Sequence, residues 1–366
     1  MAVYLDYAAA EPVRDEVLND LRTNAEFYYN PSSVNMLSRM NLTGIEGVRS
    51  LIAEKINCDP DEVYFTSGAS EANAWAVDGF LKSYENSTVI STNIEHSSIL
   101  NNPNVKPLIQ CDSKGFIHPD AIEATKDSWT ENTLIVIGHA NNEVGSIQDI
   151  EKLSKECEGQ YLMVDAAQTF NKLDIDVKKM NIDMLSASAG KIGGIRGIGF
   201  LYISKRMNIE PIIYGTQENG LRGGTYFDLG IKAFGQALEH KYDSLGVSLK
   251  RNFLLKELNK IIEIELLGTV ENRLPNNVLI NVRNTTLDSQ QIVSLLEEHG
   301  FIVSSGSACH AGNPKLSHVL EAMGYTPETA KTVIRITIGE DTDVNDLYDF
   351  ARVLDSIIDM FHAWKY

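Results

Sequence analysis

A single lysine stands among small residues in the stretch MLSASAGKIGGIRGIGFLYIS, which runs from Met184 to Ser204. This residue, Lys191, follows Asp165, a carboxylate at the end of the apolar run YLMV. A lysine amine beside a carboxylate suits formation of an imine with an aldehyde. The glycines around Lys191 permit a bulky group to approach the main chain closely. Asp165 read alone fits a helix-capping role better, so a catalytic interpretation depends on its neighbours in space.

A phosphate site is suggested by the short stretch Ser67–Ser70, which follows the apolar run VYF and opens a helical segment. Main-chain N–H groups and a hydroxyl at the start of a helix form a cup for an anion, although an ordinary helix N-cap remains an open alternative. A phosphate cup, a carboxylate and an imine-forming lysine together are what pyridoxal 5′-phosphate (PLP) requires. The carboxylate would keep the pyridine nitrogen protonated, so that the ring can accept electrons.

The elements that must position these groups are apolar strands alternating with helices. Strands are predicted in EVYF, STVIST, TLIVIG and QYLMV, each followed by a polar turn. This alternation predicts an α/β protein with a mostly parallel, seven-stranded type of sheet, covered by helices on both faces. Ligands of such sheets bind beyond the carboxyl ends of the strands. After about residue 240 the pattern changes to a smaller α+β domain, with SLKRNFLLKELNKIIEI as an amphipathic helix. We expect a large cofactor domain over 13–245 and a small domain over 1–12 and 246–366.

Composition limits the partners and the compartment. The 366 residues carry a formal net charge of −18, which disfavours nucleic acid and anionic membrane surfaces. No apolar run approaches the roughly 20 residues of a membrane span, and the N-terminal stretch has no basic start typical of a secretory signal. The four cysteines form no CxxC pair. Their pattern argues against a disulfide framework or a metal site and predicts a cytoplasmic protein.

The chain resembles a cysteine desulfurase of the NifS/IscS type, within the fold-type I PLP-dependent enzymes and the class V aminotransferase family. The motifs occur in the family's order over almost the whole chain. They are YLDYAAAEP, NPSS, FTSGASEAN, EHSSIL, ANNEVG, VDAAQTFNKLDID, SASAGKIGGIRGIGFLY, GTQENGLRGGT, VSSGSAC and VIRITIG.

The resemblance implies a role for each matching residue. Lys191 binds the PLP aldehyde, Asp165 pairs with the pyridine nitrogen, Gln168 faces the ring hydroxyl with Asn142 nearby, and His96 stacks on the ring and moves protons. The remaining cofactor-binding residues are the phosphate ligands Ala69, Ser70 and Ser188, together with Thr225, which reaches the phosphate of a partner subunit and so implies a homodimer. Substrate binding is assigned to Arg335, Asn142 and Asn30, with Arg335 clamping the substrate carboxylate. His96 as a core histidine and Arg335 as a surface ion pair remain open alternatives.

Cys309 decides which reaction the family resemblance implies. It lies in VSSGSACHAGNPKL, a stretch of small residues expected to be mobile. Desulfuration needs a thiolate that attacks the sulfur of bound L-cysteine and carries the persulfide to an acceptor protein, such as an iron–sulfur scaffold or a tRNA-thiolation protein. The alternative is a buried structural cysteine, but the flanking residues are not typical of a core.

Three positions depart from the family pattern. Relatives have histidine at the positions of Gly190 and Asn35. The family's LDNAATTP motif reads LDYAAAEP here, with Tyr7 in place of its asparagine. The resulting hypothesis is a homodimeric cytoplasmic L-cysteine desulfurase. The three departures lie around the cofactor and the substrate entrance, so they leave its affinity for PLP and its substrate preference undetermined. The alternatives are a related PLP enzyme, such as a selenocysteine lyase or an aminotransferase-like protein, and a degenerate homologue that only binds partners.

Overall fold

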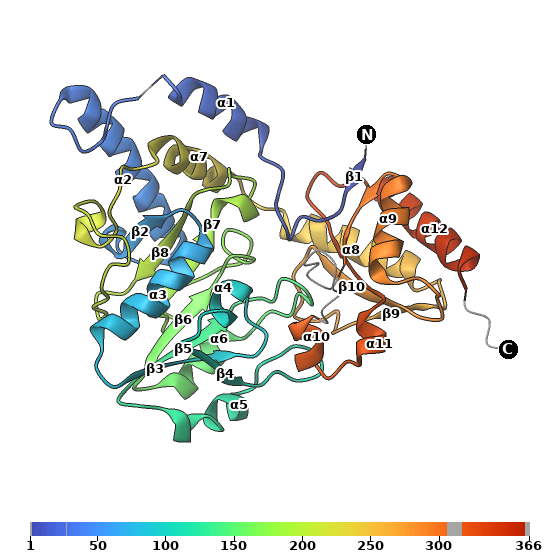
Figure 1. The fold of residues 1–366 in the computed structure, drawn as a ribbon. Helices are drawn as coiled ribbons and strands as arrows, with labels where there is room; N and C mark the ends of the chain where they lie inside the picture. Colours follow the sequence, from blue (N-terminus) through green and yellow to red (C-terminus); the bar gives the residue numbers. More distant parts are fainter. Residues whose placement is uncertain (1, 27, 306–316, 363–366) are drawn as a thin grey trace.

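The structure is a computed structural model that describes residues 2–26, 28–305 and 317–362. Figure 1 shows two sheets, each with its own helices, and an N-terminal segment that runs between them. We call them the large sheet and the small sheet. The chain termini lie on the side of the small sheet.

In the described part of the chain, seven strands form the large sheet, in the order β2-β8-β7-β6-β5-β3-β4. Neighbouring strands are parallel from β4 through β3, β5 and β6 to β7, whereas β8 runs antiparallel to both of its neighbours. The expected mostly parallel sheet is therefore confirmed. Its strands are β2 (Val63–Thr66), β3 (Ser87–Thr92), β4 (Val105–Ile109), β5 (Asn132–Gly138), β6 (Tyr161–Asp165), β7 (Met184–Ser188) and β8 (Gly199–Ile203).

Helices cover both faces of the large sheet because its strands are apolar on both faces. Leu134 and Val136 of β5 pack in one apolar core with Trp75 of α3, while Ile135 and Ile137 pack in the core on the opposite face. Alternate residues of a strand point to opposite faces, so a continuous apolar run needs cover on each. The helices of this part are α1 (Asp15–Asn24), α2 (Met36–Ile56), α3 (Ala69–Ser83), α4 (Ser97–Leu100), α5 (Pro119–Glu123), α6 (Ile150–Leu153) and α7 (Asp228–Glu239), and short 3₁₀ helices lie at Pro60–Glu62, Lys126–Ser128, Ser154–Cys157, Ala189–Lys191 and Glu218–Gly220.

The small sheet has four strands among the described residues, in the order β12-β13-β10-β9, all antiparallel. A separate apolar core joins it to helices α8, α9 and α12. Its elements are β9 (Ile264–Leu266), β10 (Asn277–Val282), β12 (Ser304–Ser305), β13 (Val333–Thr337), α8 (Ser244–Leu258), α9 (Ser289–Glu298), α10 (His318–Ala322), α11 (Pro327–Ala330) and α12 (Val344–Met360).

The N-terminus belongs to the small-sheet side before it crosses toward the large sheet. Strand β1 (Val3–Tyr4) pairs in parallel with β11 (Phe301–Ile302). The following segment, residues 5–14, which we call the N-terminal strap, then reaches the loop after β7, where Glu11 N–H donates to the carbonyl of Gly190. The strap therefore brings main-chain groups from the start of the chain next to Lys191.

One predicted helix is shorter than its sequence pattern suggests. The amphipathic stretch 248–264 was expected to be helical throughout, but α8 ends at Leu258 and Ile264 begins strand β9. The segment IIEIEL is rich in β-branched isoleucine, and pairing with β10 buries it better than another helical turn would. Gly300, expected to end α9, adopts a φ of 88°, the left-handed conformation that favours glycine after a helix.

Candidate active site

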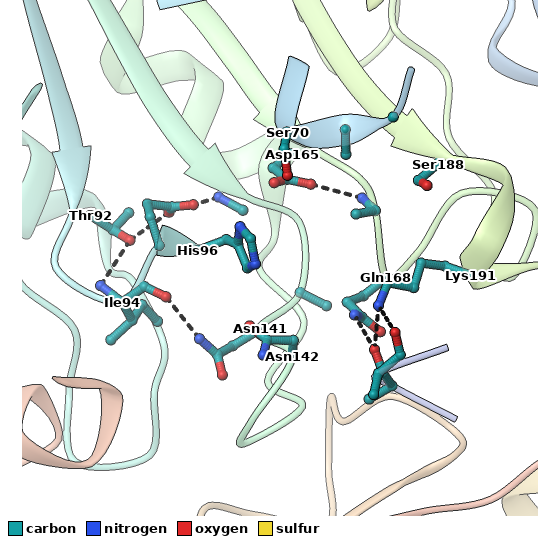
Figure 2. A pocket seen from close by; sticks show the side chains of 18 of the residues that line it. Ser70, Thr92, Ile94, His96, Asn141, Asn142, Asp165, Gln168, Ser188 and Lys191 are labelled. Atoms are coloured by element: carbon teal, nitrogen blue, oxygen red, sulfur yellow. Dashed lines mark hydrogen bonds between the residues drawn. The ribbon is translucent and has the colours of Figure 1, made fainter. Parts of the chain in front are cut away.

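A pocket of about 540 Å³ lies at the carboxyl ends of the central strands of the large sheet. This volume is in the range of small-molecule sites. Figure 2 shows how side chains from different strands and loops converge on it. The predicted site residues that line it are Ala69, Ser70, His96, Asn142, Asp165, Gln168, Ser188, Lys191 and Arg335.

The amine of Lys191 is held by the N-terminal strap. Its Nζ donates to the carbonyl oxygens of Ala8, at 2.7 Å, and Ala9, at 2.5 Å. Burial, and secondarily the positive charges of Arg335 and Lys172, lower the pKa of Lys191 to about 8. At pH 7 roughly a tenth of such amines are neutral, about 300 times the share at an ordinary pKa of 10.5. Lys191 is therefore prepared to react as a nucleophile.

The part of the pocket at the start of α3 fits an anion. Helix α3 begins after Gly68, whose φ of 151° disfavours other residues and whose missing side chain would lie 3.8 Å from Ser188 Oγ. The alternative of a side-chain N-cap is not realised, because no side chain caps α3. The hydroxyls of Ser70 and Ser188 make no hydrogen bond with a described residue, although both line the pocket. The helix start and these hydroxyls are free to bind a phosphate.

Hydrogen bonds hold both carboxylate oxygens of Asp165. Its Oδ1 accepts from the N–H of Ala167 at 2.9 Å, a contact within the turn that follows β6. Its Oδ2 accepts from Asn73 Nδ2 at 2.8 Å, and the residue still lines the pocket. Gln168, one turn further on, donates from Nε2 to the carbonyl of Ala8 at 3.2 Å. The same strap carbonyl thus contacts both Lys191 and Gln168.

His96 is not a core histidine. It is exposed, lines the pocket and caps helix α4, with Nδ1 accepting from the main-chain N–H of Ser98 at 3.1 Å. Arg335 is not a surface ion pair either, because only 8% of it is exposed. Its Nη2 pairs with Asp6 Oδ1 at 2.8 Å, its Nη1 donates to the carbonyl of Asn142 at 3.1 Å, and its buried Nε has no partner among the described residues. That orphaned donor lies on a side chain that contributes to the pocket.

Two predicted residues that the structure describes, Thr225 and Asn30, do not line this pocket. Thr225 lines a separate hollow that also reaches Ser67. Asn30 is exposed and uses its Oδ1 to accept from Ser32 N–H at 3.0 Å. Cys309 lies outside the described residues. The other cysteines, Cys58, Cys111 and Cys157, match no family motif and form no disulfide. Cys157 is buried, and burial raises the pKa of Cys111 to about 11, which leaves little thiolate.

The sequence did not indicate the buried carboxyl group of Glu95. Its Oε1 accepts from Thr92 Oγ1 at 2.6 Å and from Gly138 N–H at 2.8 Å, and burial together with the charge of Asp165 raises its pKa to about 7. Asn73, fully buried beside Asp165, was also missed. Both residues lie inside family motifs, Glu95 at the start of EHSSIL and Asn73 at the end of FTSGASEAN, but the resemblance assigned them no role.

The departures from the family pattern have local explanations. Asn35 is the N-cap of α2 and accepts from Ser38 N–H at 2.9 Å, a role that asparagine performs well. Tyr7 donates its hydroxyl hydrogen to Asp341 at 2.6 Å. The space beside Gly190 is covered by the side-chain stem of Arg196, whose Cγ is 3.2 Å from the place of a Cβ.

Taken together, the residues of the pocket fit PLP. The free donors at the start of α3 suit its phosphate, the carboxylate of Asp165 suits its pyridine nitrogen, and the amine of Lys191 suits its aldehyde. Comparison with known proteins decides the family. The profile of the Aminotransferase class-V family matches residues 3–350. The chain belongs to this family.

Individual relatives give a consistent picture. The cysteine desulfurase IscS of Dictyoglomus turgidum is 36% identical, with 98% of this chain and 94% of the relative covered. Cysteine desulfurase IscS 1 of Archaeoglobus fulgidus is 34% identical, with 98% of each chain covered. Among solved structures, a NifS-like protein from Rickettsia africae superposes with a TM-score of 0.90 at 29% identity, covering 98% of this chain and 100% of that one. SspA in complex with cysteine gives a TM-score of 0.81 at 32% identity, over 92% and 99% of the two chains.

These comparisons confirm the resemblance, the fold-type I architecture and the cofactor inferred from the sequence. As a class-V family member the protein is a PLP enzyme. Among the described residues, no helix combines the length and the apolar character that crossing a bilayer requires.

Proposed function

We propose that the protein is a PLP-dependent L-cysteine desulfurase that releases alanine and leaves a persulfide on Cys309. The observation that carries this proposal is the convergence of Lys191, Asp165, His96 and Arg335 on one pocket with a phosphate cup. The relatives that bear the name cysteine desulfurase support it, as does the neighbour described in complex with cysteine.

The pocket residues have different roles toward a bound substrate. When bound, PLP withdraws electrons from the α-carbon of the attached amino acid. Arg335 binds the substrate carboxylate, since its unpartnered Nε is a ready donor. Lys191, with its pKa lowered to about 8, can hold or release a proton at Nζ near neutral pH. His96 presents its ring to the same space and serves as a second proton carrier.

Sulfur transfer itself needs a thiol and no external oxidant. The thiolate of Cys309 attacks the substrate sulfur, the carbon–sulfur bond of cysteine breaks, and a sulfur–sulfur bond forms. The carbon takes a proton to give alanine, and Cys309 becomes a persulfide. Cys309 is four positions after Ser305 of β12, a chain length of at most about 14 Å. The preceding residue, Ser304, pairs with Arg335 on β13, so this length of chain begins beside the pocket.

We also propose that the active form is a homodimer, with Thr225 reaching the phosphate site of the partner and Asn30 acting on substrate. Large apolar side chains are strongly exposed before and at the start of α2, namely Tyr28, Val34 and Met36, and Tyr214 is 75% exposed. The 3₁₀ turn that follows Tyr214 is tied to α2 by the buried ion pair of Arg49 and Glu218, at 2.9 Å. Exposed apolar side chains of this size suit contact with a second copy of the chain.

Further parts of this proposal concern domains, location and delivery. The boundaries 13–245 for the large domain, and 1–12 with 246–366 for the small domain, remain predictions. The free cysteines support a cytoplasmic location. A protein sulfur acceptor, such as an iron–sulfur scaffold or a tRNA-thiolation protein, would take the persulfide. The net charge of −18 disfavours direct contact with nucleic acid or an anionic membrane.

The test is to supply L-cysteine to the PLP-loaded protein and to measure alanine and protein persulfide. We expect equal amounts of both in a single turnover. Cys309→Ser should bind cysteine, seen as a change in cofactor absorbance, but should produce neither product, whereas Cys111→Ser should behave like the parent. Lys191→Ala should lose the cofactor retained after borohydride reduction. Release of a 2-oxo acid instead of alanine, or full turnover by Cys309→Ser, would contradict the proposal.

A further inference from the structure

A continuous chain of hydrogen bonds joins Asp165 to His96 beneath the pocket. Asn73 Nδ2 donates to Asp165 Oδ2 at 2.8 Å and to Ser98 Oγ at 2.9 Å. Ser98 Oγ lies 2.8 Å from His96 Nδ1. Asn73 is completely buried, and its Oδ1 accepts from Ser186 Oγ at 2.6 Å. The chain links helix α3, helix α4 and strands β6 and β7.

The direction of every bond in this chain follows from its ends. A carboxylate only accepts, so the amide group of Asn73 that faces Asp165 must be the NH₂. The second hydrogen of this NH₂ is donated to Ser98 Oγ. The main-chain N–H of Ser98 donates to His96 Nδ1, so this nitrogen carries no hydrogen, and the hydroxyl of Ser98 donates to it while its oxygen accepts from Asn73. Ser186 supports the same amide orientation, because its hydroxyl donates to Oδ1.

His96 Nδ1 therefore receives two donors. One is the Ser98 hydroxyl and the other is the main-chain N–H of Ser98, at 3.1 Å. A nitrogen that accepts two hydrogen bonds carries no hydrogen, so a neutral His96 has its proton on Nε2. A histidine performs acid–base chemistry only from the nitrogen that faces the reacting atoms, and its tautomer is set by the bond that the other nitrogen makes.

We propose that Asn73 is a positioning residue that, through Ser98, fixes the Nε2–H tautomer of His96 and ties it to the carboxylate of Asp165. The inference rests on the proposed function in so far as His96 acts on a bound substrate. The two groups that contact the cofactor ring in that proposal, Asp165 and His96, would then share one buried amide as their common support. Loss of Asn73 would disturb both at once.

The test reads the tautomer directly, in protein without cofactor or cysteine. Histidine labelled with ¹⁵N gives distinct signals for protonated and unprotonated ring nitrogens, and His96→Gln identifies the signals of His96 among the eight histidines. Spectra at pH 8.5, where a free imidazole is neutral, would be compared for the parent, Ser98→Ala and Asn73→Leu. Ser97→Ala is the matched control, because Ser97 precedes Ser98 in α4 and its hydroxyl contacts no described residue.

We expect the parent and Ser97→Ala to show the Nε2–H form. Ser98→Ala should lower the ratio of Nε2–H to Nδ1–H by about 2- to 10-fold, the effect of losing one hydrogen bond. Asn73→Leu should lower it too, because the Ser98 hydroxyl then loses the donor that orients and polarises it toward Nδ1. An Nδ1–H parent, or an identical ratio in all four proteins, would overturn the inference. Because cysteine is absent, these outcomes are distinct from failure of the desulfurase assay.

Discussion

Replacing Glu95 by glutamine should stabilise the protein increasingly as the pH rises. Glu95 is 4% exposed, and burial is the main cause that raises its pKa from 4.5 to about 7. The folded protein therefore binds this proton more tightly than the unfolded chain does. Its contribution to stability is complete below about pH 4.5 and is lost as the pH rises through 7. At 1.4 kcal/mol for each tenfold change in proton affinity, the loss amounts to about 3 kcal/mol.

The glutamine variant isolates this charge. Its Oε1 can keep accepting from Thr92 and Gly138, the two hydrogen bonds that hold the carboxyl group. Compared with the parent, Glu95→Gln should gain about 0.8 kcal/mol in unfolding free energy at pH 5 and about 3 kcal/mol at pH 8. Urea unfolding of cofactor-free protein at fixed protein concentration, from pH 5 to pH 8, measures the difference. Glu123→Gln, at an exposed position, is the control.

A gain that is constant from pH 5 to pH 8, or one that shrinks with pH, would refute the reasoning. The first result would mean that Glu95 titrates alike in both states. The second would mean that the carboxylate finds a favourable partner in the folded protein.

Other residues near the pocket give further expectations. The buried amine of Lys172 lies 2.5 Å from the carboxylate of Glu11. Glu11→Gln removes this charge partner and should lower the unfolding free energy, measured in urea, by about 3–5 kcal/mol. A loss under about 1 kcal/mol would contradict this. The rate at which PLP loads onto Lys191, followed by absorbance, should rise with pH and level off above about pH 8, since the neutral amine reacts; a rate still climbing at pH 10 would exclude the lowered pKa. Gly190→His should tighten PLP binding about 10- to 100-fold at equal salt relative to Gly190→Ala, provided that the stem of Arg196 yields a few tenths of an ångström; unchanged or weaker binding would show that another group fills this space.

Sequence patterns predicted the large sheet well because they depend on local regularity. Apolar runs such as LIVI of β5 require cover on two faces, and that alone indicates a parallel sheet between helices. The same logic brought Asp165, Ser188 and Lys191 to one edge, because each follows the carboxyl end of a strand. Family motifs added His96 and Arg335, which no periodicity identifies.

What the sequence missed are contacts between distant, ordinary-looking residues. Lys191 Nζ donates to the main-chain carbonyl groups of Ala8 and Ala9. Because every residue has such a carbonyl, the residue types give no sign of this contact. The partners of Asn73 on α3 are Asp165 of β6 and Ser186 of β7, which lie far away in the sequence, so no local pattern indicates its role. The strand predicted as FIVSSG divides between β11 and β12, which belong to different sheets, because pairing partners far along the chain decide where each pair of residues goes.

The N-terminal strap affects when the pocket can form during synthesis of the chain. The carbonyl of Ala8 and the guanidinium of Arg335 line the same pocket, although they lie near opposite ends of the chain. A ribosome therefore exposes Lys191, Asp165 and the start of α3 long before Arg335 leaves the exit tunnel. The strap, in turn, is anchored by β1, whose partner β11 begins only at Phe301. A nascent chain thus carries one side of the pocket without Arg335, and the pocket is completed only when synthesis is nearly finished.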